Sequence, residues 1–108
     1  MKYETRLQNE IIDAVSDIAY LYRYQVGKFY TADGRIIKIG IKGFADLFGF
    51  RLSDGKFIVL EIKQPNGKRS PEQIKFGNAM SKQNVIYGVA HNIDEAIKII
   101  LDKNNTKC

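Results

Sequence analysis

The chain has 108 residues, of which 44% are hydrophobic and 27% charged, a composition typical of one folded domain without a linker. Seventeen Lys and Arg residues against 12 Asp and Glu give a net charge of +5, which favours a polyanionic partner. The single cysteine, Cys108, excludes an internal disulfide framework and a cysteine-based metal cluster. No segment has the apolar run of a signal peptide or a membrane span, so we expect a soluble, cytoplasmic protein without a membrane partner.

The first predicted element is an amphipathic helix from Tyr3 to about Ile18. Its apolar residues recur at helical spacing: Leu7, Ile11, Ala14, Val15 and Ile18. At 100° per residue, Glu4 and Gln8 fall within the same stripe, which places two polar groups on the inward side of the helix start. The alternative is that the first turn frays and leaves Glu4 in water, where the helix dipole favours an acid.

The next segments predict extended structure and a turn. A tyrosine-rich run predicts a strand within Leu21 to Val26 that ends near Gly27. Residues 32–35, Ala-Asp-Gly-Arg, predict a tight turn, because an Asp-Gly pair tolerates positive φ. Residues 36–43 contain four isoleucines that favour a short strand and two glycines that favour a loop. We interpret them as a loop with some extended structure.

A β-hairpin is predicted between Asp46 and Gln64. Asp46 to Leu52 and Phe57 to Gln64 have strand composition, and Ser-Asp-Gly-Lys at residues 53–56 predicts the tight turn between them. Alternate residues of a strand share a face, so Glu61 and Lys63 lie on the same side as two apolar residues that precede them. This face changes from apolar to charged, which indicates a candidate site.

A second helix follows the basic loop at residues 65–69. Ser70 is its predicted cap, Pro71 occupies the first helical position, and Gln73 stands where the second member of a capping box belongs. The helix is expected to run to about Lys82.

The remaining elements are a buried strand at Val85 to Ala90 and a last helix from about Ile93, with Asn92 as its cap. Residues 104–108 are polar and predicted to fray. The elements follow the order αβββαβα. We therefore expect a single α/β domain over residues 1–108, with a mixed central sheet flanked by helices.

Four charged residues form the candidate site: Glu4, Asp46, Glu61 and Lys63. Carboxylates are the hard oxygen ligands that Mg²⁺ or Mn²⁺ uses, together with waters and substrate phosphates. Folding about the hairpin turn brings Asp46 within about one register step of Glu61 or Lys63. Lys63 could then orient or deprotonate an attacking water. The alternative is that Glu61 and Lys63 form the solvated end of an edge strand.

These motifs together resemble the VRR-NUC branch of the PD-(D/E)xK nuclease superfamily. The resemblance rests on Gly-Phe-Ala-Asp-Leu at 43–47, Glu-Ile-Lys at 61–63, Lys-Arg-Ser-Pro-Glu-Gln at 68–73, and the preceding helix with Glu4 and Gln8. It covers nearly the whole chain in order. The sequence departs from the family at residues 87–91, Tyr-Gly-Val-Ala-His, which lack the Val-Arg-Arg triplet.

The resemblance implies a restriction-endonuclease-like core with Mg²⁺ or Mn²⁺ as its cofactor. It implies that Asp46, Glu61 and the backbone carbonyl of Ile62 hold the metal, and that Lys63 is catalytic. Glu4 would contribute from the first helix. Gln73 matches the Gln that opens the helix after the basic loop, so it could point at Lys63 or a phosphate as well as cap its helix.

Basic residues near this site are the candidates for nucleic-acid binding. Lys68 and Arg69 stand in the adjacent loop, Lys75 on the following helix, and Lys42 just before the Asp46 turn. Each could neutralise a phosphate, and none would read sequence. The alternative for each is an ordinary solvated charge.

Two other residue types are less informative. His91, the only histidine, is interpreted as a loop residue rather than a general base. Four tyrosines could stack on bases, but their strand spacing fits packing as well, and we favour packing: Tyr20, Tyr22, Tyr24 and Tyr30.

The function implied by the resemblance is a metal-dependent DNA endonuclease that hydrolyses phosphodiester bonds, selective for branched or flapped DNA. Small free-standing members would act as homodimers that present two sites, and they suit a phage or mobile element. The alternative is a catalytically inactive nucleic-acid-binding module of the same fold. A third interpretation, an interaction domain, requires the acidic cluster to be accidental.

Overall fold

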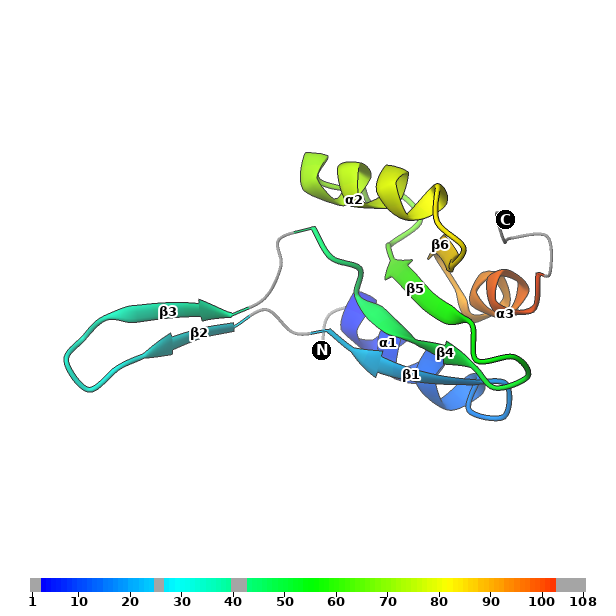
Figure 1. Ribbon diagram of the computed structural model, residues 1–108, viewed down its shortest axis with the longest axis horizontal. Helices are drawn as coiled ribbons and strands as arrows, with labels where there is room; N and C mark the ends of the chain where they lie inside the picture. Colours follow the sequence, from blue (N-terminus) through cyan, green and yellow to red (C-terminus); the bar gives the residue numbers. More distant parts are fainter. Residues whose placement is uncertain (1–2, 25–26, 40–42, 103–108) are drawn as a thin grey trace.

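The computed structural model describes residues 3–24, 27–39 and 43–102. Within these residues the protein is an α/β domain with a mixed four-stranded sheet, a separate two-stranded hairpin and three helices (Figure 1). In chain order, the elements are α1 (Tyr3–Ala14), β1 (Ala19–Arg23), β2 (Gly27–Tyr30), β3 (Ile36–Ile39), β4 (Leu47–Arg51), β5 (Phe57–Ile62), α2 (Pro71–Ser81), β6 (Ile86–Ala90) and α3 (Ile93–Leu101).

The larger sheet has the strand order β1-β4-β5-β6. Its first three strands are antiparallel neighbours, and β6 joins β5 in parallel. A parallel pair requires a crossover connection, and α2 lies in that connection. The sheet is therefore mixed, as predicted, and β5 lies in its interior with a partner on each side.

Helices lie on both sides of the sheet, and α2 packs mainly against β6. Two close approaches show this for β6. Gly88 of β6 lies against Ile99 of α3, where an added Cβ would clash. Tyr87, the residue before Gly88, lies against Gly77 of α2, where an added Cβ would also clash. Consecutive strand residues point to opposite faces, so α3 and α2 lie on opposite sides of β6. The hydrophobic core lies on the α3 side, where Leu7 and Ile11 of α1 join the apolar residues of β4, β5 and β6.

The hairpin formed by β2 and β3 corrects the predicted strand order. Ile36–Ile39 is a strand paired with Gly27–Tyr30, not a loop, and the observed order is αβββββαβα. Figure 1 shows this hairpin projecting away from the four-stranded sheet. The predicted turn at residues 32–35 is confirmed: the chain reverses there with Gly34 at a φ of 89°, and Thr31 N donates to Arg35 O over 2.9 Å.

Two predicted boundaries are also wrong. The first helix ends at Ala14 rather than Ile18, because Ile18 N and Ala19 N both bond to Val15 O in a tight turn that leads into β1. That strand starts at Ala19 and ends at Arg23, and the predicted strand residues 25–26 lie outside the described ranges. The predicted fraying of residues 104–108 also falls outside them.

The two later helices begin at the predicted caps. Ser70 and Gln73 form both hydrogen bonds of a capping box at the start of α2. The side chain of Asn92 accepts a hydrogen bond from Glu95 N over 2.8 Å at the start of α3. None of the helices in the described ranges has both the length and the apolar character needed to cross a membrane.

Candidate functional site

Glu61 lies at the centre of the candidate site and is completely buried, with 0% of its surface exposed. Strand β5 pairs with β4 on one side and with β6 on the other. The alternative that Glu61 is the solvated end of an edge strand is therefore wrong. An acid in this position has left water entirely, which is costly unless a proton, a hydrogen-bond donor or a cation compensates it.

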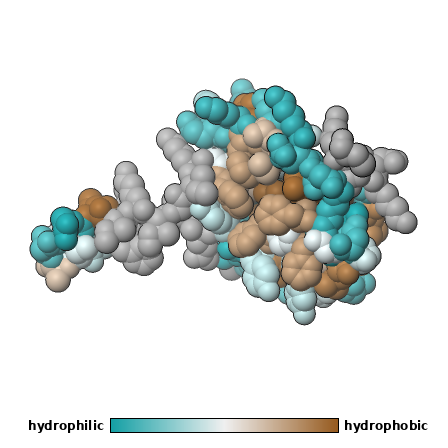
Figure 2. Space-filling view, in the orientation of Figure 1, coloured by the Kyte–Doolittle hydropathy of each residue, from teal (hydrophilic) through white to brown (hydrophobic). Residues whose placement is uncertain are grey.

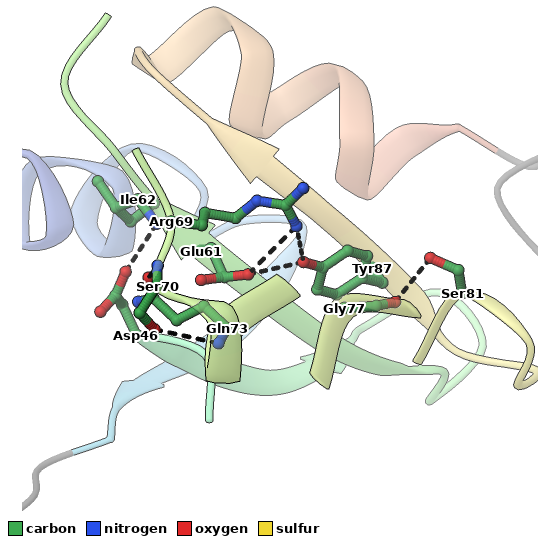
Figure 3. Close-up of polar contacts among 9 residues, drawn as sticks. All are labelled: Asp46, Glu61, Ile62, Arg69, Ser70, Gln73, Gly77, Ser81 and Tyr87. Carbon is green, nitrogen blue, oxygen red and sulfur yellow. Dashed lines mark hydrogen bonds and ion pairs between the residues drawn. The ribbon is translucent and has the colours of Figure 1, made fainter. Parts of the chain in front are cut away.

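One carboxylate oxygen of Glu61 is held by two side chains from other elements. The hydroxyl of Tyr87, on β6, donates to Oε2 of Glu61 over 2.6 Å. Arg69, in the loop before α2, donates from Nη1 to the Tyr87 hydroxyl over 3.1 Å, and the same nitrogen lies 3.8 Å from Oε2. Figure 3 shows these three side chains converging on the same side of the sheet.

The other oxygen, Oε1, is buried and makes no hydrogen bond within the part of the chain that the structure describes. Burial raises the pKa of the Glu61 carboxyl, and the hydrogen bond from Tyr87 and the nearby positive charges oppose that rise. Buried polar atoms nearly always have partners. An orphaned acidic oxygen inside a sheet therefore marks a position where a cation or a proton would be favourable.

Asp46 lies beside Glu61, at the point where the chain enters β4. The register Leu47↔Leu60 places Asp46 opposite Glu61, as the predicted hairpin requires. Oδ2 of Asp46 accepts a hydrogen bond from Ile62 N over 2.8 Å. Burial raises the pKa of Asp46, while the Ile62 hydrogen bond and the charge of Lys63 lower it. Two carboxylates that both carry a burial penalty thus meet at one end of β5.

Lys63 and Glu4 lie near the same end of β5. Lys63 is partly buried, its backbone N donates to Ala90 O over 3.0 Å, and its charge acts to lower the pKa of both Asp46 and Glu61. The Glu4 carboxylate accepts from Gln64 N over 3.3 Å, and its charge acts to raise the pKa of Asp46. The structure therefore brings all four predicted charged residues together.

The donor set fits a hard divalent cation that takes few protein ligands. No three Asp, Glu, His or Cys side chains in the described residues form a ready metal-binding group. Mg²⁺ is commonly held by one or two carboxylates, with waters and substrate phosphates filling the other positions. Asp46 and Glu61 could supply those two carboxylates, and Oε1 of Glu61 has no hydrogen-bond partner among the described residues.

Gln73 acts as a helix cap in this structure. Its Oε1 accepts from Ser70 N over 2.9 Å, and its own N donates to Ser70 Oγ over 3.1 Å. The capping prediction is confirmed. A role for its side-chain amide at the site stays a prediction.

The predicted nucleic-acid-binding residues separate into different environments. Lys68 and Lys75 are exposed to solvent, on the loop and on α2 respectively. Arg69 instead turns toward Tyr87 and Glu61 and leaves 32% of its side chain exposed. Lys42 lies outside the described residues.

Tyr87 is the site residue that sequence reasoning missed. The parallel register pairs it with Val59, so it shares a sheet face with Glu61. Burial and the Glu61 carboxylate both raise the pKa of Tyr87, which keeps the hydroxyl protonated as a donor. The available signal was a tyrosine in a strand whose other residues are small or aliphatic. That signal does not identify Glu61 as its neighbour, because the neighbour depends on the order of the strands in the sheet.

His91 and the tyrosines largely follow their predicted roles. His91 lies in the bend before α3, with Nδ1 2.9 Å from Glu95 Oε1.

Ring pairs confirm the packing prediction for three of the four tyrosines: Tyr20 with Phe50, Tyr22 with Phe48, and Tyr24 with Phe44. The packing prediction is wrong for Tyr30, which is 72% exposed. Figure 2 shows apolar side chains gathered on the sheet face that α2 leaves open.

No protein-family model matches the chain, and no curated protein is significantly similar to it. The functional interpretation therefore rests on the geometry of the site.

Proposed function

We propose that the protein is a metal-dependent DNA endonuclease with a restriction-endonuclease-like core of the VRR-NUC type. The observation that carries this proposal is the orphaned Oε1 of Glu61, buried in a central strand beside Asp46. Lys63 follows two residues later, just after β5 ends, and its charge acts on both carboxylates. Paired carboxylates with an adjacent lysine are the groups that phosphodiester hydrolysis with Mg²⁺ or Mn²⁺ needs.

In this proposal Asp46, Glu61 and the backbone carbonyl of Ile62 would hold the metal, and Glu4, at the start of α1, would contribute a further negative charge. A metal held there would supply Lewis-acid stabilisation of the phosphate and would lower the pKa of a water bound to it. Lys63 supplies a fixed positive charge that orients the attacking water and offsets charge developing on the phosphate. Gln73 is an additional candidate for contact with Lys63 or the phosphate.

Substrate binding in this proposal uses exposed basic side chains close to the site. Lys68 lies in the loop that leads to Arg69, and Lys75 lies on α2. These groups, together with Lys42, would neutralise phosphates without reading bases. We propose branched or flapped DNA as the preferred substrate and a cytoplasmic setting, with an origin in a phage or mobile element.

A second candidate is a nucleic-acid-binding module of the same fold that does not cut. The observation that favours it is Arg69, whose guanidinium already places positive charge 3.8 Å from the Glu61 carboxylate. A guanidinium in that position compensates a buried acid without a metal.

One experiment separates these candidates. Purified protein is incubated with branched, flapped and plain duplex DNA, with MgCl₂, with MnCl₂ or with EDTA, beside Glu61→Gln and Lys63→Met. Glu10→Gln, on the exposed side of α1, is the control substitution. The proposal expects metal-dependent cutting that both site variants lose and the control retains. Cutting that survives either site substitution contradicts the mechanism, and DNA binding without cutting by the unsubstituted protein favours the second candidate.

The proposed assembly is a homodimer, since one active site cuts one strand and two subunits would present two sites to a branched substrate. Sedimentation at the concentration of the cleavage assay tests it. A monomer with full activity would rule out the dimer requirement while leaving the chemistry unaffected.

A further inference from the structure

The Tyr87 hydroxyl fixes the orientation of the Glu61 carboxylate. The two side chains come from the same face of adjacent parallel strands, and the hydroxyl donates to Oε2 over 2.6 Å. Hydrogen bonds to an ionised acceptor are short and strong. One oxygen of the carboxylate is thereby anchored, and Figure 3 shows the other oxygen on the side of Asp46.

Arg69 determines the direction of that hydrogen bond. A tyrosine hydroxyl has one proton to donate, whereas a guanidinium only donates. Because Arg69 Nη1 donates to the Tyr87 oxygen over 3.1 Å, the single hydroxyl proton is left to point at Glu61. The two hydrogen bonds therefore run in one direction, from Arg69 to Tyr87 and from Tyr87 to Glu61.

Gly77 provides the space that this arrangement occupies. A Cβ at position 77 would lie 2.3 Å from the Tyr87 hydroxyl oxygen and 3.0 Å from Arg69 Nη1. A glycine inside a helix makes the helix less stable than an alanine would. Here that cost has a local reason, because only a residue without a side chain lets α2 lie against the hydroxyl.

We propose that Tyr87, directed by Arg69 and admitted by Gly77, is a positioning residue that anchors Oε2 of Glu61 and leaves Oε1 turned toward a divalent cation. This inference rests on the proposed function, since it assigns a geometric role around the same metal. In this role Tyr87 acts through Glu61, the acid to which its hydroxyl donates. Its contribution is to remove the rotational freedom of a ligand that is otherwise unpaired on one side.

The test measures Mn²⁺ affinity without DNA, by electron paramagnetic resonance of the free ion, for the unsubstituted protein and Tyr87→Phe. Loss of a group that orients a metal ligand typically weakens binding by about 10- to 100-fold. We expect a loss in that range in protein that is still folded in EDTA, with a lowered melting temperature because the buried Glu61 carboxylate loses a hydrogen-bond donor. Tyr22→Phe is the matched control, a half-exposed tyrosine on the same sheet face, and it should bind Mn²⁺ normally.

A second variant keeps the test decisive if Tyr87→Phe folds poorly. Gly77→Ala retains every polar group but drives a methyl group against the hydroxyl, and it should also weaken Mn²⁺ binding, whereas Asn78→Ala on the exposed side of α2 should not. Normal Mn²⁺ affinity in a folded Tyr87→Phe or Gly77→Ala protein would overturn the positioning role while the proposed function stands. Absence of both Mn²⁺ binding and cleavage in the unsubstituted protein would overturn both.

Discussion

Oδ2 of Asp46 accepts a hydrogen bond from the backbone nitrogen of Ile62 over 2.8 Å, across the antiparallel pair β4 and β5. The bond ties one acid of the site directly to the strand that carries the other. It also gives Asp46 two separable roles, because its oxygen satisfies a backbone donor and its charge faces Glu61. Substitutions that remove only one of these roles can separate architecture from chemistry.

Asp46→Asn keeps an acceptor for Ile62 N, whereas Asp46→Ala removes it. Leaving a buried donor unpaired costs about 1–3 kcal/mol, so we expect the alanine variant to lose that much free energy of unfolding and the asparagine variant much less. Both should lose metal-dependent cleavage. Urea denaturation in EDTA and a cleavage assay check the two effects. Full cleavage by Asp46→Asn would show that the charge is not needed.

Divalent metal should stabilise the protein through Glu61. An ion at about 100 times its dissociation constant adds about 2.7 kcal/mol to the free energy of unfolding of a protein that binds it only when folded. Glu61→Gln should abolish the rise in melting temperature with MnCl₂, and Glu10→Gln should preserve it. An equal rise in Glu61→Gln would place the ion elsewhere.

The ion pair between Arg51 and Asp54 predicts a pH dependence away from the site. The nearly buried Arg51 contacts Asp54 through two hydrogen bonds, of 3.0 and 2.6 Å, and lowers the pKa of Asp54 from 3.8 to about 2. A lowered folded-state pKa contributes stability that is present above about pH 4 and lost as the pH falls toward about 2. Asp54→Asn should lower stability at neutral pH and flatten the dependence below about pH 4, which urea denaturation at several pH values measures. Asp17→Asn is the control. If the stability of Asp54→Asn still fell below about pH 4 as steeply as that of the unsubstituted protein, the role given to the Arg51–Asp54 ion pair would be contradicted.

Two strand glycines should differ in their tolerance of alanine. A Cβ at Gly49 would lie 1.8 Å from the backbone oxygen of Tyr20, whereas at Gly88 the nearest atom, at 2.6 Å, is the end of the Ile99 side chain. Backbone cannot yield as a side chain can, so Gly49→Ala should cost about 3 kcal/mol, at the upper end of overpacking effects, and Gly88→Ala less. Equal losses in urea denaturation would contradict this difference.

Local signals in the sequence predicted several elements correctly. The capping residues Ser70 and Asn92 start their helices as expected, and the Asp-Gly turn at residues 53–56 joins β4 to β5. Each of these features depends on residues close together in the chain. The adjacency of Asp46 and Glu61 was predictable for the same reason, since a hairpin register follows from its turn.

Features that depend on sheet order were not predictable in this way. Glu61 could be placed on a strand face, but its complete burial depends on β6 joining β5 in parallel through the α2 crossover. The pairing of Tyr87 with Glu61 has the same origin. The β2–β3 hairpin was missed because its glycine-interrupted isoleucine segment also fits a loop, and its strands find partners only in each other among the described residues.

The connection between β1 and β4 has a consequence for local opening. Arg23 pairs with Leu47, and Tyr24 N donates to Asp46 O over 2.9 Å, so the chain that carries the β2–β3 hairpin leaves the main sheet and returns to it at one point. Loss of the β2–β3 pairing breaks no hydrogen bond of the larger sheet. Amide hydrogens of this hairpin should therefore exchange with solvent through a small local opening, while those of β4 and β5 await unfolding of the whole domain. The hydrogen bond between Tyr24 and Asp46 therefore marks the boundary between fast-exchanging and slowly exchanging amides. It holds in place the residue that the proposed chemistry requires in a fixed position.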